Sequence, residues 1–188
     1  MPTPRLVLAA FAAAVLAVPV ASAQAPAPAT PTPAPAAQPP AVPEAMPFDI
    51  PYGTPISMDM AHKAIQAAAA EAKKHNWKMA ITVVDPNGNL VAHATMDGTQ
   101  YASIPIAQAK ARTAAQYRRP SKVFEDAVNT GGRPSVLSLM TLTNGAASEG
   151  GFPIVVDGKL IGAIGASGGI SSQDAATAHA GLVAIGGK

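Results

Sequence analysis

The stretch AITVVDPNGNLVAHATM, residues 80–96, has the pattern of a β-hairpin and decides the fold class. Residues 79–84 and 89–96 are rich in apolar and β-branched side chains, which favours strands. Between them, Asp85-Pro86-Asn87-Gly88 is a strong turn signal. The stretch therefore predicts two antiparallel strands joined by a tight turn.

A second hairpin is expected in FPIVVDGKLIGAIGAS, residues 152–167, where Asp157-Gly158 is a preferred two-residue turn. Apolar periodicity and cap signals predict four helices around the hairpins, at residues 57–74, 103–117, 121–129 and 171–185, with Ser57 or Asp59, Ser103 and Ser171 as cap residues. The stretch PSVLSLMTLTNGAASEGG, residues 134–151, shows no clear period and is expected to be irregular. Hairpins that alternate with helices predict an α+β fold with an antiparallel sheet, rather than a doubly wound parallel one.

The first 23 residues have the features of an export signal. Arg5 is followed by an apolar run over residues 6–20 and by Ala21-Ser22-Ala23, a pattern that signal peptidase accepts. The run is shorter than the roughly 20 apolar residues that a membrane-spanning helix needs. We expect cleavage after Ala23, a periplasmic or secreted mature protein, and no membrane anchor.

The composition changes again after the expected cleavage point. Residues 24–47 are mainly alanine and proline, which favours an extended, disordered linker. The folded domain is expected over residues 48–188. A net charge of +2 without any basic run gives no reason to expect a nucleic-acid partner, and the absence of cysteine excludes disulfides, thiolate ligands and covalent haem attachment.

Four stretches together resemble the GlcG/HbpS family, also described as haem-binding or PduO C-terminal-like. They are AITVVDPNGNLVAHATMDGT, ASIPIAQAKARTAA, EGGFPIVVDGKLIGAIGASGG and QDAATAHAG. The resemblance implies an antiparallel sheet of about five strands with helices on both faces, a layering that fits antiparallel sheets in general. It also implies a homo-oligomer, and it makes non-covalently bound haem a possible cofactor, since exported members include haem-binding proteins.

Two basic residues, Lys110 and Arg112, lie in the alanine-rich helix expected over residues 103–117. Because they are two positions apart, they point to different sides of the helix. One could meet a carboxylate inside the protein while the other faces a cleft. For Arg112 we consider both an internal ion pair and an anion anchor, for example for a haem propionate.

His62, His93 and Glu149 complete the candidate ligand-binding residues. His62 shares a helix face with Asp59, an arrangement that orients metal ligands but is also common on solvated helix faces; it is our candidate metal ligand, toward haem iron. His93 lies on a mostly apolar strand, where a histidine is either a hydrogen-bonded core group or a ligand. Glu149 lies in a glycine-rich segment that could border a ligand cleft.

No motif in the sequence requires catalysis, and we predict no catalytic residue. There is no GxSxG elbow, and the glycines of GAIGASGGISSQDAA fit neither dinucleotide nor phosphate-loop spacing, so a tight strand-to-helix connection is favoured there. We favour an exported, non-covalent haem-binding protein that acts as a carrier, store or sensor accessory. The alternatives are an enzyme or binding protein for a small organic acid, and a non-catalytic oligomeric scaffold.

Overall fold

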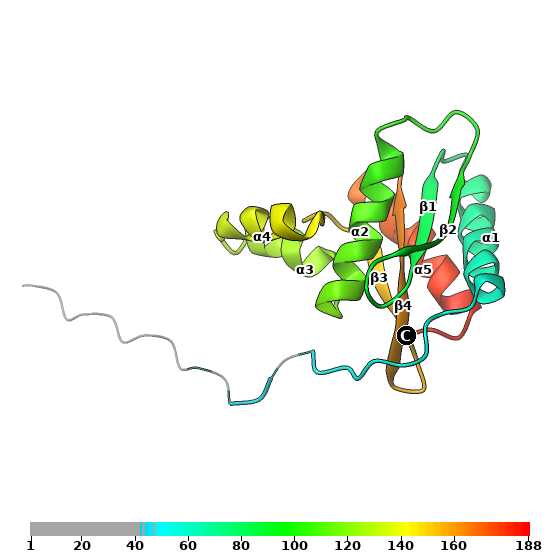
Figure 1. The fold of residues 1–188 in the computed structure, drawn as a ribbon. Helices are drawn as coiled ribbons and strands as arrows, with labels where there is room; N and C mark the ends of the chain where they lie inside the picture. The colour runs from blue at the N-terminus through cyan, green and yellow to red at the C-terminus, as the bar shows by residue number, and fades with distance from the viewer. Residues whose placement is uncertain (1–41, 43, 47) are drawn as a thin grey trace, which may run out of the picture. The chain divides into compact units, whose positions relative to one another are not determined.

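The computed structural model describes residues 42, 44–46 and 48–188 (Figure 1). The expected export signal, residues 1–23, and almost all of the expected linker, residues 24–47, lie outside the described residues, so both stay predictions. The described residues from Glu44 to Lys188 belong to one compact unit. Within the described part of the chain, no helix is both long and apolar enough to cross a membrane.

The domain is built on a four-stranded antiparallel sheet with the strand order β2-β1-β4-β3. Its strands are β1 (Ala80–Val84), β2 (Leu90–Thr95), β3 (Gly151–Val156) and β4 (Lys159–Ser167). Both predicted hairpins and the α+β class are confirmed. The sheet has four strands where the resemblance implied about five, and Tyr52 adds only an isolated parallel bridge to Leu160.

Helices cover both faces of the sheet, as predicted (Figure 1). On one face, α1 (Met58–Lys74) and α5 (Ser171–Ala184) pack together, and a Cβ added to Gly181 of α5 would lie 2.6 Å from Ile164 Cδ1 of β4. On the other face lies α2 (Ser103–Tyr117), whose backbone closely approaches Gly165 of β4. Successive strand residues point to opposite faces of a sheet. Ile164 therefore faces the layer of α1 and α5, whereas its neighbour Gly165 faces α2.

The small side chains of α2 explain its close contact with the sheet. Four alanines on its inner face are fully buried, namely Ala107, Ala111, Ala114 and Ala115. A Cβ added to Gly165 would lie 2.6 Å from the backbone nitrogen of Ala111, so glycine is required there. Alanine on the helix and glycine on the strand together let the helix lie almost directly on the sheet.

The helix ends differ in part from the expectations. Ser57 caps α1 as predicted, with Met60 N–H donating to its Oγ at 3.3 Å. Ser103 is already the first residue of α2 rather than its cap, because Ala102 occupies that position in helical conformation. Ser171 is likewise the first residue of α5 rather than its cap, because Ile170 occupies the cap position, and Gln173 Oε1 accepts the Ile170 N–H at 3.2 Å.

A pair of short helices projects from the side of the sheet (Figure 1). They are α3 (Lys122–Asn129), close to its predicted bounds, and α4 (Ser135–Thr143). The expectation of an irregular segment at residues 134–151 was wrong over α4. The apolar residues of α4 lie on all its sides, so the sequence shows no helical period; they include Val136, Leu137, Leu139 and Leu142. Residues 122–143 are called the arm below.

Candidate functional site

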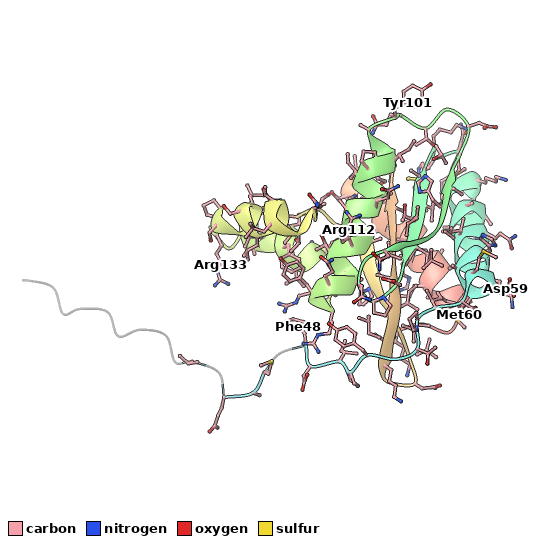
Figure 2. The ribbon with its side chains drawn as sticks, in the orientation of Figure 1. Phe48, Asp59, Met60, Tyr101, Arg112 and Arg133 are labelled. Carbon is pink, nitrogen blue, oxygen red and sulfur yellow. The ribbon has the colours of Figure 1, made fainter. Side chains whose placement is uncertain are left out.

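Arg112 lies in the middle of α2, between the β1–β2 turn and the base of the arm (Figure 2). Its aliphatic stem contacts the turn, since a Cβ added to Gly88 would lie 2.8 Å from Arg112 Cγ. Its Nη1 donates a hydrogen bond to the backbone carbonyl of Asn144, just after α4, at 3.0 Å. The residue therefore lines two surface hollows, one on each side.

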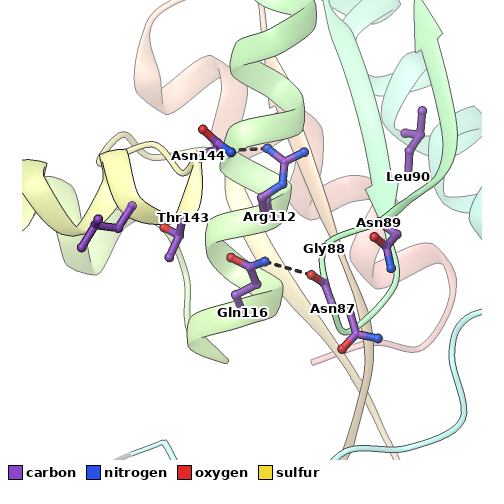
Figure 3. A pocket seen from close by; sticks show the side chains of 9 residues that line it. Asn87, Gly88, Asn89, Leu90, Arg112, Gln116, Thr143 and Asn144 are labelled. Atoms are coloured by element: carbon purple, nitrogen blue, oxygen red, sulfur yellow. Dashed lines mark hydrogen bonds between the residues drawn. The ribbon is translucent and has the colours of Figure 1, made fainter.

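The first hollow has a volume of about 490 Å³ and is mainly polar (Figure 3). It lies between the β1–β2 turn, α2 and the end of α4. Gln116 Nε2 donates to the carbonyl of Asn87 at 2.9 Å and fixes the turn against α2. Around the Arg112 guanidinium this hollow offers amide and hydroxyl groups from Asn87, Asn89, Gln116, Thr143 and Asn144.

The second hollow, of about 570 Å³, lies between α2 and α4 and has an apolar wall. That wall consists of Pro105, Ala109, Leu137, Met140 and Ala147, and Arg112, Gln108, Thr141 and Asn144 lie at its polar side. Both hollows fall within the range of about 300–1,000 Å³ that is usual for small-molecule sites. An amphipathic ligand could thus place an anionic group at Arg112 and an apolar body against α4.

The guanidinium of Arg112 forms no ion pair with a carboxylate in the described part of the chain. It is half-buried and its one recorded acceptor is the Asn144 carbonyl. A guanidinium has five N–H donors in a rigid fork that matches a carboxylate. The internal ion pair considered for Arg112 is therefore not present among these residues, and the group is available to an external anion.

The internal ion pair of α2 is formed by Lys110 instead. Lys110 Nζ lies 2.7 Å from Asp174 Oδ2, and both side chains are almost completely buried, with exposed fractions of 2% and 3%. Burial raises the pKa of the Asp174 carboxyl above its ordinary value, although Lys110 and the Gly169 N–H act in the opposite direction. The pair joins α2 to α5 across the end of the sheet, so the structure places Lys110 away from both hollows.

His93 lies on β2 opposite Thr82 of β1, and Thr82 in turn lies opposite Gly165 of β4. Because paired residues point to the same face of a sheet, His93 points to the face that α2 covers at Gly165. Its Nδ1 is 2.8 Å from Thr82 Oγ1 and its Nε2 is 2.8 Å from Thr95 Oγ1, so a threonine hydroxyl holds each ring nitrogen. Partial burial lowers the pKa of His93 below its ordinary value. His93 does not line either hollow, and its predicted role as a ligand stays a prediction.

The lowered pKa of His93 predicts a loss of stability at mildly acidic pH. An ordinary histidine has a pKa near about 6.5, so below that pH the unfolded chain takes up a proton that the native His93 resists. Stability that is fully present above about pH 6.5 is then lost as the pH falls toward the lowered pKa.

We expect His93→Gln to flatten the dependence of the unfolding free energy on pH between about 7.5 and 5, as measured by urea denaturation. His62→Gln, at an exposed position on α1, is the control. An unchanged pH dependence in His93→Gln would contradict the assignment.

His62 and Glu149 lie apart from Arg112 and from each other. His62 is exposed on α1, and the described residues contain no group of three His, Asp or Glu side chains that could hold a metal ion. Glu149 precedes β3, and its backbone N–H donates to Glu125 Oε2 at 2.8 Å. Neither lines the hollows. An axial haem ligand requires only one side chain, so both stay predictions.

The glycine-rich connection before α5 is already occupied by the protein's own side chains. Asp174 Oδ1 accepts the N–H of Gly169 at 3.0 Å, and Gln173 Oε1 accepts that of Ile170. An internal carboxylate thus takes the place that a phosphate has in nucleotide-binding loops. This agrees with the expected strand-to-helix connection.

Sequence reasoning missed most of the residues around Arg112. Leu137 and Met140 belong to α4, which was not predicted, and Asn144 ends that helix in left-handed conformation with φ 48°. Asn144-Gly145 after an apolar run is a helix-ending signal that could have revealed them. Gln116 could not be identified, since only the packed turn gives it a partner.

Comparison with known proteins places this fold among solved relatives. The model of the family described as "Haem degrading protein HbpS-like" matches residues 56–183. Protein GlcG of Escherichia coli strain K12 is 44% identical over 112 residues, which are 60% of this chain and 81% of that protein. Corrinoid adenosyltransferase PduO of Salmonella typhimurium is 29% identical over 138 residues, and the match spans 70% of this chain but only 40% of that protein.

Solved structures agree with this assignment. The crystal structure of a PduOC–haem complex has a TM-score of 0.65 at 26% identity and covers 72% of this chain and 98% of its own. A double mutant of HbpS from Streptomyces reticuli has a TM-score of 0.63 at 26% identity, with coverages of 77% and 97%. The family model, the sequence relatives and the fold agree over most of the described domain, and the chain belongs to the HbpS-like family.

Proposed function

We propose that the protein is an exported, non-covalent haem-binding protein that serves as a carrier, store or sensor accessory. The observation that carries the proposal is Arg112, a guanidinium without a carboxylate partner in the described chain, beside an apolar wall. The PduOC–haem complex among its structural relatives supports haem as the ligand. The sequence pattern of residues 1–23 supports export.

The residues of the second hollow fit the two chemically distinct parts of haem. Arg112 would hold a propionate, with the Gln108 and Asn144 amides beside it, and Leu137 and Met140 would contact the macrocycle. The Met140 thioether would offer the iron a soft ligand from that wall, where Thr113 Oγ1 donates to its sulfur at 3.8 Å. When bound, haem supplies an iron centre for one-electron and oxygen chemistry.

Haemin titration of the purified protein, followed in the Soret region, tests the proposal. We expect saturable one-to-one binding that Arg112→Gln weakens about tenfold to a hundredfold, because a charge-assisted hydrogen bond to a propionate is lost. Arg133→Gln, at the far end of the arm, is the matched control and should bind like the wild type (Figure 2). His62→Ala, His93→Ala and Met140→Leu then identify the axial ligand by a changed Soret position.

A non-saturating shift that is the same in the wild type and in Arg112→Gln would contradict the proposal.

A second candidate function, binding of a small organic acid, is favoured by the first hollow, where amide groups surround Arg112. Titration calorimetry with lactate, a 2-hydroxy acid, separates the two. Heat that saturates with lactate and is lost in Arg112→Gln, without haemin binding, would put the organic acid first.

A further inference from the structure

The first hollow beside Arg112 combines one charge with a set of neutral polar groups. Among the described residues that line it, Arg112 is the only one with an ionisable side chain. Its other polar residues carry amides or a hydroxyl, namely Asn87, Asn89, Gln116, Thr143 and Asn144. Because amides both donate and accept hydrogen bonds, this lining complements a ligand that has one negative charge and several hydroxyl groups.

Much of the hydrogen-bonding capacity of these amides is unused. In the part of the chain that the structure describes, the side-chain amides of Asn87 and Asn144 make no hydrogen bond, and only their backbone atoms are engaged (Figure 3). Asn89 Nδ2 donates to Asp85 Oδ2 at 2.9 Å, which leaves the Asn89 amide oxygen to a ligand. Gln116 donates through its Nε2 to the Asn87 carbonyl and leaves its oxygen in the same way. Free amide groups from the turn, from α2 and from the end of α4 are therefore available to ligand hydroxyls.

The β1–β2 turn presents its share of these groups in a fixed position. Asp85 Oδ1 accepts the backbone N–H groups of Asn87 and Asn89, at 2.8 and 2.9 Å. The hydrogen bond from Gln116 attaches the same turn to α2. Because this wall is formed before a ligand binds, little conformational entropy is lost on binding.

The chemistry of the hollow favours a sugar acid as its ligand. A hexuronate such as glucuronate has one carboxylate for the Arg112 fork and a ring of hydroxyls for the amides, and its C–H groups can contact Leu90 and Leu142, which also line the hollow. Lactate has a single hydroxyl, so it would leave most of the amides and most of the volume of about 490 Å³ unused. A phosphate ester would bring a second negative charge, for which the described lining offers no lysine.

Ligands in the two hollows use the same positive charge. Arg112 and Asn144 line both hollows, which lie on different sides of the guanidinium. A guanidinium that already holds one carboxylate attracts a second one less, and the two carboxylates repel each other at short range. A sugar acid in the first hollow therefore opposes a haem propionate in the second, and by linkage this opposition is reciprocal.

We propose that the first hollow binds a sugar acid, with the carboxylate at Arg112 and the hydroxyls at the surrounding amides, and that the bound sugar acid weakens haem binding. The site itself is independent of haem. Only the coupling rests on the proposed function, because it needs a propionate at the same guanidinium. The two hollows then form an exchange site, in which a sugar acid favours the release of haem.

Titration calorimetry of the purified protein with glucuronate tests the site. We expect saturable binding at least about tenfold tighter than that of lactate, because several more hydrogen bonds form, and no binding of glucose, which lacks the carboxylate. Asn87→Ala should weaken glucuronate binding about threefold to tenfold, since the hydrogen bonds of one neutral amide are lost. Asn129→Ala, which removes an exposed asparagine at the end of α3, is the matched control and should bind like the wild type.

Three results would overturn the site. One is the absence of saturable heat with glucuronate. Another is an affinity for lactate or for glucose that equals the affinity for glucuronate. The third is an Asn87→Ala variant that binds glucuronate as tightly as Asn129→Ala.

Haemin titration at a saturating concentration of glucuronate tests the coupling. The Kd for haemin should rise about fivefold or more, as is usual for coupled sites. Without glucuronate, Asn87→Ala should bind haemin like the wild type, since Asn87 lines the first hollow and not the second. An unchanged Kd in the presence of glucuronate would overturn the coupling. A protein that binds glucuronate but no haemin would instead refute the proposed function and leave the sugar-acid site in place.

Discussion

Asp174→Asn is expected to lower the free energy of unfolding by about 3–5 kcal/mol, because it leaves the ammonium group of Lys110 buried without a counter-charge. The Lys110 Nζ and Asp174 Oδ2 atoms are 2.7 Å apart, and both side chains are almost fully enclosed. The exchange keeps the volume of the side chain and an acceptor for the Gly169 N–H. The decrease in unfolding free energy therefore reports the missing charge rather than a change in packing, and urea denaturation measures this decrease.

The double variant Lys110→Met/Asp174→Asn is the decisive comparison. It removes both charges, so it should recover much of the stability that Asp174→Asn loses, since the main cost of breaking a buried ion pair is the uncompensated charge that remains. Lys122→Met, which breaks the exposed pair with Asp126, is the matched control and should cost less than about 1 kcal/mol. If Asp174→Asn also costs less than this, the Lys110 ammonium is neutralised or hydrated in some other way, and the account of the pair is wrong.

Gly165→Val is expected to cost about 3 kcal/mol or more, because it inserts a branched side chain between β4 and α2. Even a single Cβ at this position would lie 2.6 Å from the Ala111 nitrogen and 3.0 Å from its Cβ. The backbone of α2 cannot yield as a flexible side chain can, so the whole helix must move away from the sheet. Arg112 would move with it, and haemin binding should weaken together with stability.

Lys159→Val introduces the same side chain on the same strand at an exposed position and serves as the control. Its unfolding free energy should stay within about 0.5 kcal/mol of the wild type, as is usual for surface substitutions. Should Gly165→Val unfold at the same urea concentration as this control, the close contact between α2 and the sheet would not be a requirement of the fold.

The elements of the fold could be predicted where the sequence carries a local signal. Asp85-Pro86-Asn87-Gly88 and Asp157-Gly158 identify both hairpins, because few other residues adopt the turn conformations that they require. The periodic residues of α1 and the Ser57 cap identify that helix almost to the residue. α4 was missed because it lacks such a signal: its apolar residues lie on all its sides and show no helical period.

The candidate site could be predicted only in part. The two-residue spacing of Lys110 and Arg112 predicts that they point to different sides of α2, but it does not tell which one is buried. That choice depends on Asp174, which lies 64 positions away in the chain. Ligand roles for His62, His93 and Glu149 stay predictions, because the structure gathers none of the three at the hollows.

The sequence by itself determined the hairpins, the antiparallel α+β class and four of the five helices at nearly correct bounds, although the cap residues of α2 and α5 differ from those predicted. Each of these follows from residues close together in the chain, whose backbone preferences act before any tertiary contact forms. Only the tertiary structure decided the strand order β2-β1-β4-β3, the burial of Lys110 against Asp174 and the exposure of the Arg112 guanidinium between two hollows. These depend on contacts between distant segments, and a buried charge selects its partner by proximity in the folded chain.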